Sequence, residues 1–291
     1  MTIEKEKSRT VLNEIQKAVA SIRNKRPAYE KILNFYEKVF LIQEASGSMV
    51  EVEPAEISES ALSLKKEEKL PLVQMSDFIV DHKRAAADFI QICNILGEGS
   101  PKMAQAAPKI IDALDRKLFK PESFFDALLQ KNDESLTIAA DDLGLDPEVL
   151  SFVIYNSVQP SVNNCGHQFS VYLDPKTPFD AGYCPVCGNL PALSSLGKDG
   201  ERFLSCSFCW HQWRVKRIFC PFCENTVSSK LNYLYADDEK EYRVDGCDKC
   251  KKYLKTIDTR KLERPFYPRL EEVATLHLDM IAQEKWQASD V

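Results

Sequence analysis

Apolar positions recur every three to four residues through most of the first 157 residues, a spacing that predicts helices. The clearest stripe lies within residues 76–96, where apolar side chains fall on one face of a helix: Phe78, Ala85, Phe89, Cys93 and Leu96. Pro101, Pro121 and Pro147 each precede a further helical stretch, and proline is favoured in the first turn, where its missing N–H costs little. The pattern predicts an all-helical domain over residues 1–157.

The helical period is lost over residues 158–183, where prolines, glycines, Asn and Asp gather; this composition predicts a connector. Residues 184–260 then contain short β-type runs that separate pairs of cysteines. The helical period returns in residues 261–291, with an apolar stripe formed by Leu270, Val273, Ala274, His277, Leu278 and Ile281. We expect this last helix to pack back on the core of the protein.

Eight of the ten cysteines occur as Cys-x-x-Cys pairs, namely Cys184/Cys187, Cys206/Cys209, Cys220/Cys223 and Cys247/Cys250. Taken in order, the first two pairs read C-x2-C-x18-C-x2-C and the last two read C-x2-C-x23-C-x2-C. Both spacings are typical of zinc ribbons and rubredoxin-like sites, in which two loops each supply two thiolates to one tetrahedral ion. The sequence therefore predicts one four-cysteine ribbon over residues 184–215 and a second over residues 216–260.

Two residues between cysteines allow a tight turn to aim both sulfurs at one ion about 2.3 Å away. Each ribbon is too short to bury enough apolar surface by itself, so a metal is expected to hold it together. Two other arrangements remain open: the two inner pairs in one site, or a cross-paired treble clef. A redox dithiol is the chemical rival for any single pair.

Four thiolates suit either zinc or a single iron ion, so two metal ions, zinc or iron, are predicted. Rubredoxin-type turns usually carry glycine after the second cysteine. Here only Gly188 occupies such a position, whereas Trp210, Glu224 and Lys251 stand at the other three. This departure favours zinc without excluding iron.

Composition and charge narrow the class of protein. A hydrophobic content of 44% and a charged content of 28% in 291 residues are typical of a soluble protein. The net charge of −6 argues against a general binder of nucleic acid or of anionic membranes. The N-terminal residues are charged and contain no apolar core of a signal peptide, and no stretch is apolar enough to span a bilayer. We expect a cytoplasmic protein with no membrane insertion, where structural disulfides are rare.

Trp213, Arg214 and Arg217 lie near the junction of the two ribbons and are candidates for binding a partner. The competing interpretation is that the tryptophan covers the metal site and that the arginines form a solvated face. The sequence contains no phosphate-binding loop, nucleophile elbow, HExxH motif or GxGxxG motif. We therefore expect no catalytic residues and no enzymatic activity. Cys93 is expected in the helical core, and Cys165 in an ordinary loop.

The cysteine region, from "CPVCGNLPALSSL" through "CSFCWHQWRVKRIFCPFCEN" to "YRVDGCDKCKKYLKTID", resembles the formate dehydrogenase accessory protein family, FdhE. The resemblance covers residues 184 to about 281 and includes the order of the four pairs. It implies a cytoplasmic assembly factor that binds the catalytic subunit of formate dehydrogenase during maturation, with the eight paired cysteines as metal ligands. The fold expected is α+β: an N-terminal all-helical domain, two tandem rubredoxin-like or zinc-ribbon subdomains, and a C-terminal helix.

Two other functions remain open. A rubredoxin-like iron protein could carry electrons during formate dehydrogenase maturation. A zinc-ribbon protein could bind nucleic acid, although the predicted partners include none.

Overall fold

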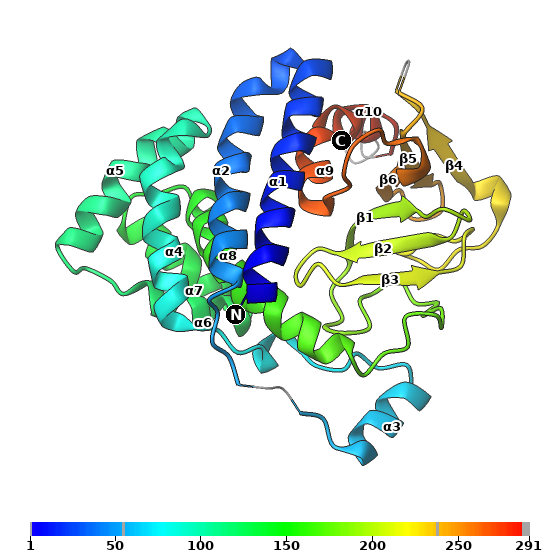
Figure 1. Cartoon of the computed structure of the whole chain (residues 1–291), viewed down its shortest axis with the longest axis horizontal. Helices are drawn as coiled ribbons and strands as arrows, with labels where there is room; N and C mark the ends of the chain where they lie inside the picture. The colour runs from blue at the N-terminus through cyan, green and yellow to red at the C-terminus, as the bar shows by residue number, and fades with distance from the viewer. Residues whose placement is uncertain (1, 54–55, 237–238, 287–291) are drawn as a thin grey trace. The chain divides into compact units, whose positions relative to one another are not determined.

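A computed structural model describes residues 2–53, 56–236 and 239–286, with the side chains of the first helix described from Thr10 onward. The chain divides into two compact units (Figure 1). Unit 1 comprises the described residues within 1–55 and 74–168, and unit 2 comprises those within 56–73 and 169–291. The combination of a helical N-terminal region, two four-cysteine groups and C-terminal helices confirms the predicted fold class.

The regular elements among the described residues of unit 1 are all helices. Its helices are α1 (Thr2–Lys25), α2 (Glu30–Gly47), α4 (His82–Ile95), α5 (Pro101–Asp115), α6 (Pro121–Leu129), α7 (Asp133–Asp142) and most of α8 (Pro147–Ser170). Short 3-10 turns lie at Pro27–Tyr29, Met75–Asp77 and Leu96–Glu98.

Side-chain caps and prolines set where these helices begin. The Asp81 carboxylate accepts a hydrogen bond from the Arg84 N–H at 3.0 Å, and the Asn132 side chain accepts one from the Ser135 N–H at 3.1 Å. Such caps satisfy N–H groups that have no partner inside the helix. Pro101, Pro121 and Pro147 stand at the first helical position, as the sequence predicts.

The predicted apolar stripe forms part of the core of unit 1, with Phe78 before the start of α4 and Leu96 directly after its end. Its members are all buried: Phe78, Ala85, Phe89, Cys93 and Leu96. They pack with aromatic and aliphatic side chains of neighbouring helices, including Phe125 on α6. A buried polar contact joins α2 to α8, where the Gln43 side chain donates to the Asn156 backbone oxygen at 3.0 Å and to its side-chain oxygen at 2.9 Å.

Helix α8 corrects one expectation. The sequence predicts a connector from residue 158, but α8 continues through Pro160 to Ser170, so the chain becomes irregular only after that residue. The reason lies in the apolar spacing, since Val158, Val162, Cys165 and Phe169 recur at helical intervals and are all buried. Burial of this stripe outweighs the cost of one proline and several residues of low helix propensity. Cys165 therefore lies in a helix and not in a loop.

Unit 2 is built on one six-stranded sheet. Its strands are β1 (Pro191–Leu196), β2 (Arg202–Cys206), β3 (Gln212–Val215), β4 (Leu231–Leu234), β5 (Tyr242–Cys247) and β6 (Tyr253–Asp258), in the order β3-β2-β1-β6-β5-β4. Further 3-10 turns lie at Ser228–Lys230 and Thr259–Lys261. All neighbouring pairs are antiparallel except β1 and β6, which are parallel.

The strand order shows how the two ribbons are joined. Each ribbon contributes three antiparallel strands, β1–β3 and β4–β6. Across the sheet, the strands of each ribbon follow one another in reverse chain order. The last strand of the second ribbon, β6, pairs with the first strand of the first ribbon, β1, from Leu193↔Lys255 to Leu196↔Asp258. Because this pairing is parallel, β1 and β6 begin at the same end of the sheet, and the cysteine turns that precede them lie at that end.

Helices α9 (Pro268–Ala274) and α10 (Leu276–Trp286) follow the last strand, and α10 packs against β5 and β6 (Figure 1). A buried cluster fills the space between α10 and the sheet, formed by Leu193, Tyr242, Val244, Ile257, Leu278, Ala282 and Trp286. Gly246 on β5 is required for this packing, because a Cβ atom there would lie 2.0 Å from the Trp286 ring. In the structure the C-terminal helical segment therefore lies against the sheet of unit 2.

Residues 56–73 also belong to unit 2 and include helix α3 (Glu59–Glu67). The N–H groups of Leu72 and Val73 donate to the carbonyls of Pro185 and Val186, both at 2.9 Å. These two bonds hold residues 72–73 against the first cysteine turn. Among the described residues, no helix combines the length and the apolar character that crossing a bilayer requires.

Candidate metal centres

The four Cys-x-x-Cys pairs form similar turns: one backbone hydrogen bond recurs in all four turns, and a second is found in three of them. In the first bond, the N–H of the first cysteine donates to the carbonyl five residues later, at 2.8–3.0 Å: Cys184 to Asn189, Cys206 to His211, Cys220 to Asn225 and Cys247 to Lys252. In the second, the N–H of the residue after the pair donates to the carbonyl of the first cysteine, at 2.8 Å: Gly188 to Cys184, Glu224 to Cys220 and Lys251 to Cys247. These bonds turn both cysteine side chains to the same side.

The residue after the second cysteine has a left-handed backbone in all four turns. The φ angles are 74° at Gly188, 56° at Trp210, 55° at Glu224 and 59° at Lys251. A residue with a Cβ atom tolerates this conformation at a cost of about 1–2 kcal/mol. The three turns without glycine therefore adopt the glycine conformation, and the absence of glycine gives no reason to prefer zinc over iron.

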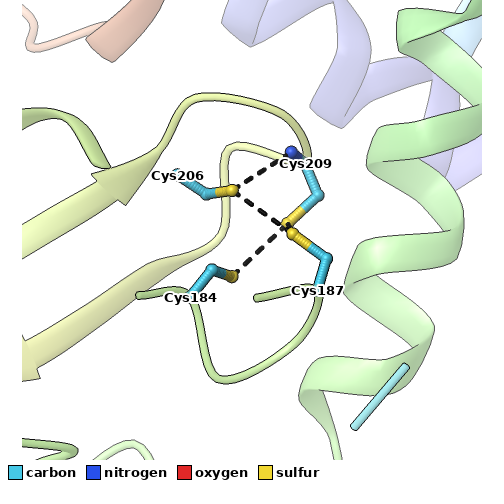
Figure 2. Close-up of side chains that lie close together, drawn as sticks. All are labelled: Cys184, Cys187, Cys206 and Cys209. Atoms are coloured by element: carbon cyan, nitrogen blue, oxygen red, sulfur yellow. Dashed lines mark hydrogen bonds between the residues drawn. The ribbon is translucent and has the colours of Figure 1, made fainter. Parts of the chain in front are cut away.

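The first group gathers the sulfurs of Cys184, Cys187, Cys206 and Cys209 between two facing turns (Figure 2). The Sγ–Sγ distances are 3.7 Å for Cys184 and Cys209, 3.4 Å for Cys187 and Cys206, and 3.6 Å for Cys187 and Cys209. One turn precedes β1, and the other lies between β2 and β3. The β1–β2 hairpin thus brings the two turns together.

The second group gathers Cys220, Cys223, Cys247 and Cys250 in the same way. The Sγ–Sγ distances are 3.6 Å for Cys220 and Cys250 and 3.7 Å for Cys223 and Cys247. The predicted assignment of the eight cysteines to two consecutive quartets is confirmed, and neither the inner-pair site nor the cross-paired arrangement is formed.

Both groups fit a tetrahedral metal ion. Four sulfurs at about 2.3 Å from a central ion lie about 3.8 Å apart, close to the distances observed, and all ligand atoms in each group lie within 4.8 Å of one another. A disulfide would need a distance of about 2.05 Å, and all eight cysteines are free. Each group can therefore hold one ion with an all-thiolate donor set, which suits zinc or iron.

The surroundings of the first group act on its thiols in opposite directions. Burial raises the pKa of the Cys184 thiol, whereas hydrogen bonds from Cys184, Cys206 and Cys209 lower the pKa of Cys187. The N–H groups of Phe208 and Cys209 also donate to the Cys206 sulfur, at 3.3 and 3.4 Å. Donors of this kind favour the thiolate form, the form that binds metals.

The two groups differ in exposure. All four cysteines of the first group are buried. In the second group Cys223 and Cys250 are partly exposed, whereas Cys220 and Cys247 are buried. An ion in the second group would therefore have solvent on one side.

The candidate partner-binding residues lie in different environments. Trp213 on β3 is buried, and its indole N–H donates to the Ala181 carbonyl at 3.4 Å. Arg214 is half-buried, and Arg217 is exposed.

Sequence patterns did not indicate a further polar cluster on the sheet. Arg202 on β2 is buried and forms an ion pair with Asp245 on β5, with 3.2 Å between Nη2 and Oδ2. Only the strand order brings these two residues together, so spacing along the chain carries no signal for the pair.

The chain thus has a helical unit followed by one sheet with two rubredoxin-like four-cysteine groups. This combination defines a protein with two candidate metal sites. The family profile described as "FdhE, central domain" matches residues 183–217. The "Protein FdhE homolog" of Aquifex aeolicus (strain VF5) is 28% identical over 274 residues, which cover 91% of this chain and 88% of that protein. The chain is thus similar to FdhE proteins over most of its length, and its cysteine region matches the family profile.

Two further comparisons agree. "Protein FdhE" of Escherichia coli O139:H28 is 36% identical over 114 residues, which are 38% of this chain and 36% of that protein. The crystal structure of the FdhE protein from Pseudomonas aeruginosa matches with a TM-score of 0.65 and 20% identity, over 94% of this chain and 92% of that one. At this identity the structural match shows the fold alone.

Proposed function

We propose that this protein is a formate dehydrogenase accessory factor that binds the catalytic subunit during its maturation and is not itself an enzyme. The similarity to FdhE proteins and the two four-cysteine groups support an accessory role in formate dehydrogenase formation. The observation that carries the proposal is the pair of quartets, because they fit a structural metal without an open coordination position for a substrate.

In this proposal each quartet holds one metal ion that stabilises its ribbon. The two ribbons share one sheet, so loss of either ion would also weaken the surface that the other presents. Metal binding then supplies folding free energy, as in other small metal-stapled domains. Arg214 and Arg217 are proposed to contact the catalytic subunit, and the buried Trp213 is proposed to support them.

A co-purification experiment tests this function. Tagged full-length protein is expressed with the formate dehydrogenase catalytic subunit and purified without oxygen. The unaltered protein should retain the subunit, whereas Cys187→Ser and Cys223→Ser together should release it. Cys93→Ala is the matched control, since it removes a buried thiol outside both quartets and should leave binding intact. Retention of the subunit by the double Cys→Ser variant would contradict the proposal.

A redox role for iron is the second candidate, favoured by the partly exposed Cys223 and Cys250. An ion with one side open to solvent can exchange electrons with a partner more readily than a buried one. Metal analysis and the visible spectrum of protein purified without oxygen decide the matter. Colourless protein that contains only zinc would eliminate this candidate.

A further inference from the structure

A cavity of about 460 Å³ opens beside the second four-cysteine group, between β2, β4, β5 and the segment that joins the two ribbons. Its volume lies in the range of sites that bind ligands. Cys220 and Cys247 contribute to its wall, but their sulfurs belong to the quartet. The remaining wall is formed by residues to which the two predicted metal sites assign no role.

Basic side chains outnumber acidic ones on this wall. Arg202, Arg217, Arg243 and Lys252 line the cavity, and Asp245 is the acidic residue among its lining residues. Asp245 is engaged on both sides, with Arg202 at 3.2 Å and with Arg243 at 2.7 Å. Arg217 and Lys252 are exposed at the rim, so positive charge remains available to an incoming anion.

Aromatic rings hold three of these cations in place. The guanidinium of Arg243 lies 5.3 Å from the centre of the Tyr233 ring, the Lys252 ammonium lies 5.6 Å from the Phe222 ring, and Arg202 lies 5.9 Å from the Phe219 ring. Contacts of this kind orient a cation without neutralising its charge. The wall is therefore an ordered array of cations and rings.

The cavity borders a strand that has no neighbour on its outer side. β4 ends the sheet, and within the described residues no further strand pairs with it. The opposite edge differs, because the Phe179 N–H donates to the Arg214 carbonyl of β3 at 2.9 Å. An uncovered edge strand is a template for an added strand.

Exposed apolar side chains surround the same place. Tyr233 on β4 is 61% exposed and Ile218 is 60% exposed, and both line the cavity. Tyr235, just beyond β4, is also exposed and lies edge-on to Tyr233. Tyrosine and arginine are enriched where proteins contact other proteins. The rim therefore favours a peptide over a small free anion.

We propose that this groove, defined by Arg217, Tyr233, Arg243, Lys252 and the outer edge of β4, binds an extended acidic segment of a partner protein. The backbone of the segment pairs with β4, and one or more of its carboxylates enter the cavity between Arg217, Arg243 and Lys252. The inference rests on the proposed accessory function, for which it supplies the chemistry of the segment recognised. The positive lining selects acidic side chains, and the open strand edge selects an extended backbone.

Peptide binding to the full-length, metal-loaded protein tests the groove. Three fluorescent peptides of equal length and high strand propensity are compared by anisotropy, one with glutamate, one with glutamine and one with lysine at alternate positions. The glutamate peptide should bind at least tenfold more tightly than the glutamine peptide, and its binding should weaken with salt. Equal binding of the glutamate and glutamine peptides would overturn the proposal.

Charge-reversal variants locate the site. Arg217→Glu and Lys252→Glu, both at exposed positions, should each weaken binding of the glutamate peptide about tenfold. Lys66→Glu is the matched control, because Lys66 is exposed on α3 and does not line the cavity. Loss of binding in the control alone, or in none of the three variants, would overturn the proposal. Tighter binding of a single-stranded oligonucleotide, abolished by the same two variants, would also overturn it by assigning the groove to nucleic acid.

Hydrogen exchange separates edge pairing from simple charge attraction. The bound glutamate peptide should slow exchange of backbone amides in residues 231–234, and unchanged exchange there would overturn the strand-addition part of the proposal. The co-purification experiment distinguishes this inference from the proposed function. If the catalytic subunit binds the Arg217→Glu and Lys252→Glu variants as well as it binds the unaltered protein, the groove proposal fails while the accessory function stands. If the subunit never binds, the accessory function fails, and the peptide assay still decides whether the groove exists.

Discussion

Arg202 and Asp245 belong to different ribbons, yet their side chains meet at 3.2 Å inside unit 2. Arg202 also donates from Nε to the Ser194 hydroxyl at 3.0 Å and from Nη1 to the Phe219 carbonyl at 3.0 Å. Asp245 in turn accepts from the Thr256 hydroxyl at 2.8 Å. The guanidinium therefore contacts the first ribbon, the segment between the ribbons and the second ribbon, and it joins them into one structure.

Removal of this guanidinium should destabilise unit 2. Arg202→Met leaves Asp245 without one of its partners and frees a buried carbonyl, so the free energy of unfolding should fall by about 3 kcal/mol. All three tryptophans lie in unit 2, and fluorescence during denaturant unfolding therefore reports on this unit. Lys261→Met, which removes a half-exposed ion pair with Asp258, is the control and should cost less than about 1 kcal/mol. Equal effects of the two changes would show that Arg202 does not join the ribbons.

The two metal groups should release their ions at different rates. Cys223 and Cys250 are partly exposed, whereas the first quartet is buried, so a chelator reaches the second ion without any opening of the fold. Protein loaded with zinc should release metal to a chromophoric chelator in a fast phase and a slow phase. Cys223→Ser should remove the fast phase and Cys187→Ser the slow one. A single phase from the unaltered protein would contradict this expectation.

Substitutions at equivalent positions of two cysteine turns should affect the free energy of unfolding differently. Gly188→Ala places a side chain at a φ of 74° with its Cβ 3.0 Å from Pro71 Cγ, and the free energy of unfolding should fall by about 1–2 kcal/mol. Lys251→Gly removes a side chain from a φ of 59°, and it should leave stability unchanged or raise it by up to about 1 kcal/mol, because the gain is offset by the freedom of glycine in the unfolded chain. Denaturant unfolding of both variants provides the measurement. A clear loss of stability in Lys251→Gly would show that the lysine side chain has a further role.

Asp88 should make the stability of unit 1 depend on pH. Burial raises the pKa of this carboxyl from 3.8 to about 6, opposed by the neighbouring Ser46 hydroxyl and by the charge of Arg84. The folded state therefore holds the proton more tightly than the unfolded chain. The stabilisation is fully present below about pH 4 and is lost as the pH rises towards 6.

The Asp88→Asn variant checks this dependence. The variant cannot lose a proton at this position, so its stability relative to the unaltered protein should increase between pH 4 and 6 and then level off. Circular dichroism during urea unfolding at several pH values follows unit 1, because that unit is helical. A constant difference between the two proteins at all pH values would show that Asp88 titrates normally in the folded state.

Local chemistry explains which features could be predicted from the sequence. A Cys-x-x-Cys turn is fixed by five consecutive residues, so the quartets of the first and second ribbons follow from spacing. The stripe from Phe78 to Leu96 likewise identifies α4 through its 3.6-residue period. By contrast, the low helix propensity of Pro160 and Gly166 led to the prediction of a connector where α8 continues. Propensity can be judged from neighbouring residues, whereas the free energy gained by burying the α8 stripe depends on residues that are distant in the chain.

The sequence by itself determined two things about this protein: the helical character of its first half and the division of eight cysteines into two quartets. Both depend on residues that are near one another in the chain. Only the tertiary structure decided that the ribbons share a sheet through the parallel pairing of β1 with β6, that Arg202 reaches Asp245, and that a basic cavity opens beside the uncovered β4. These features require contacts between residues about forty to sixty positions apart, such as Arg202 with Asp245 and Leu193 with Lys255, and no period or spacing records which distant strands will pair.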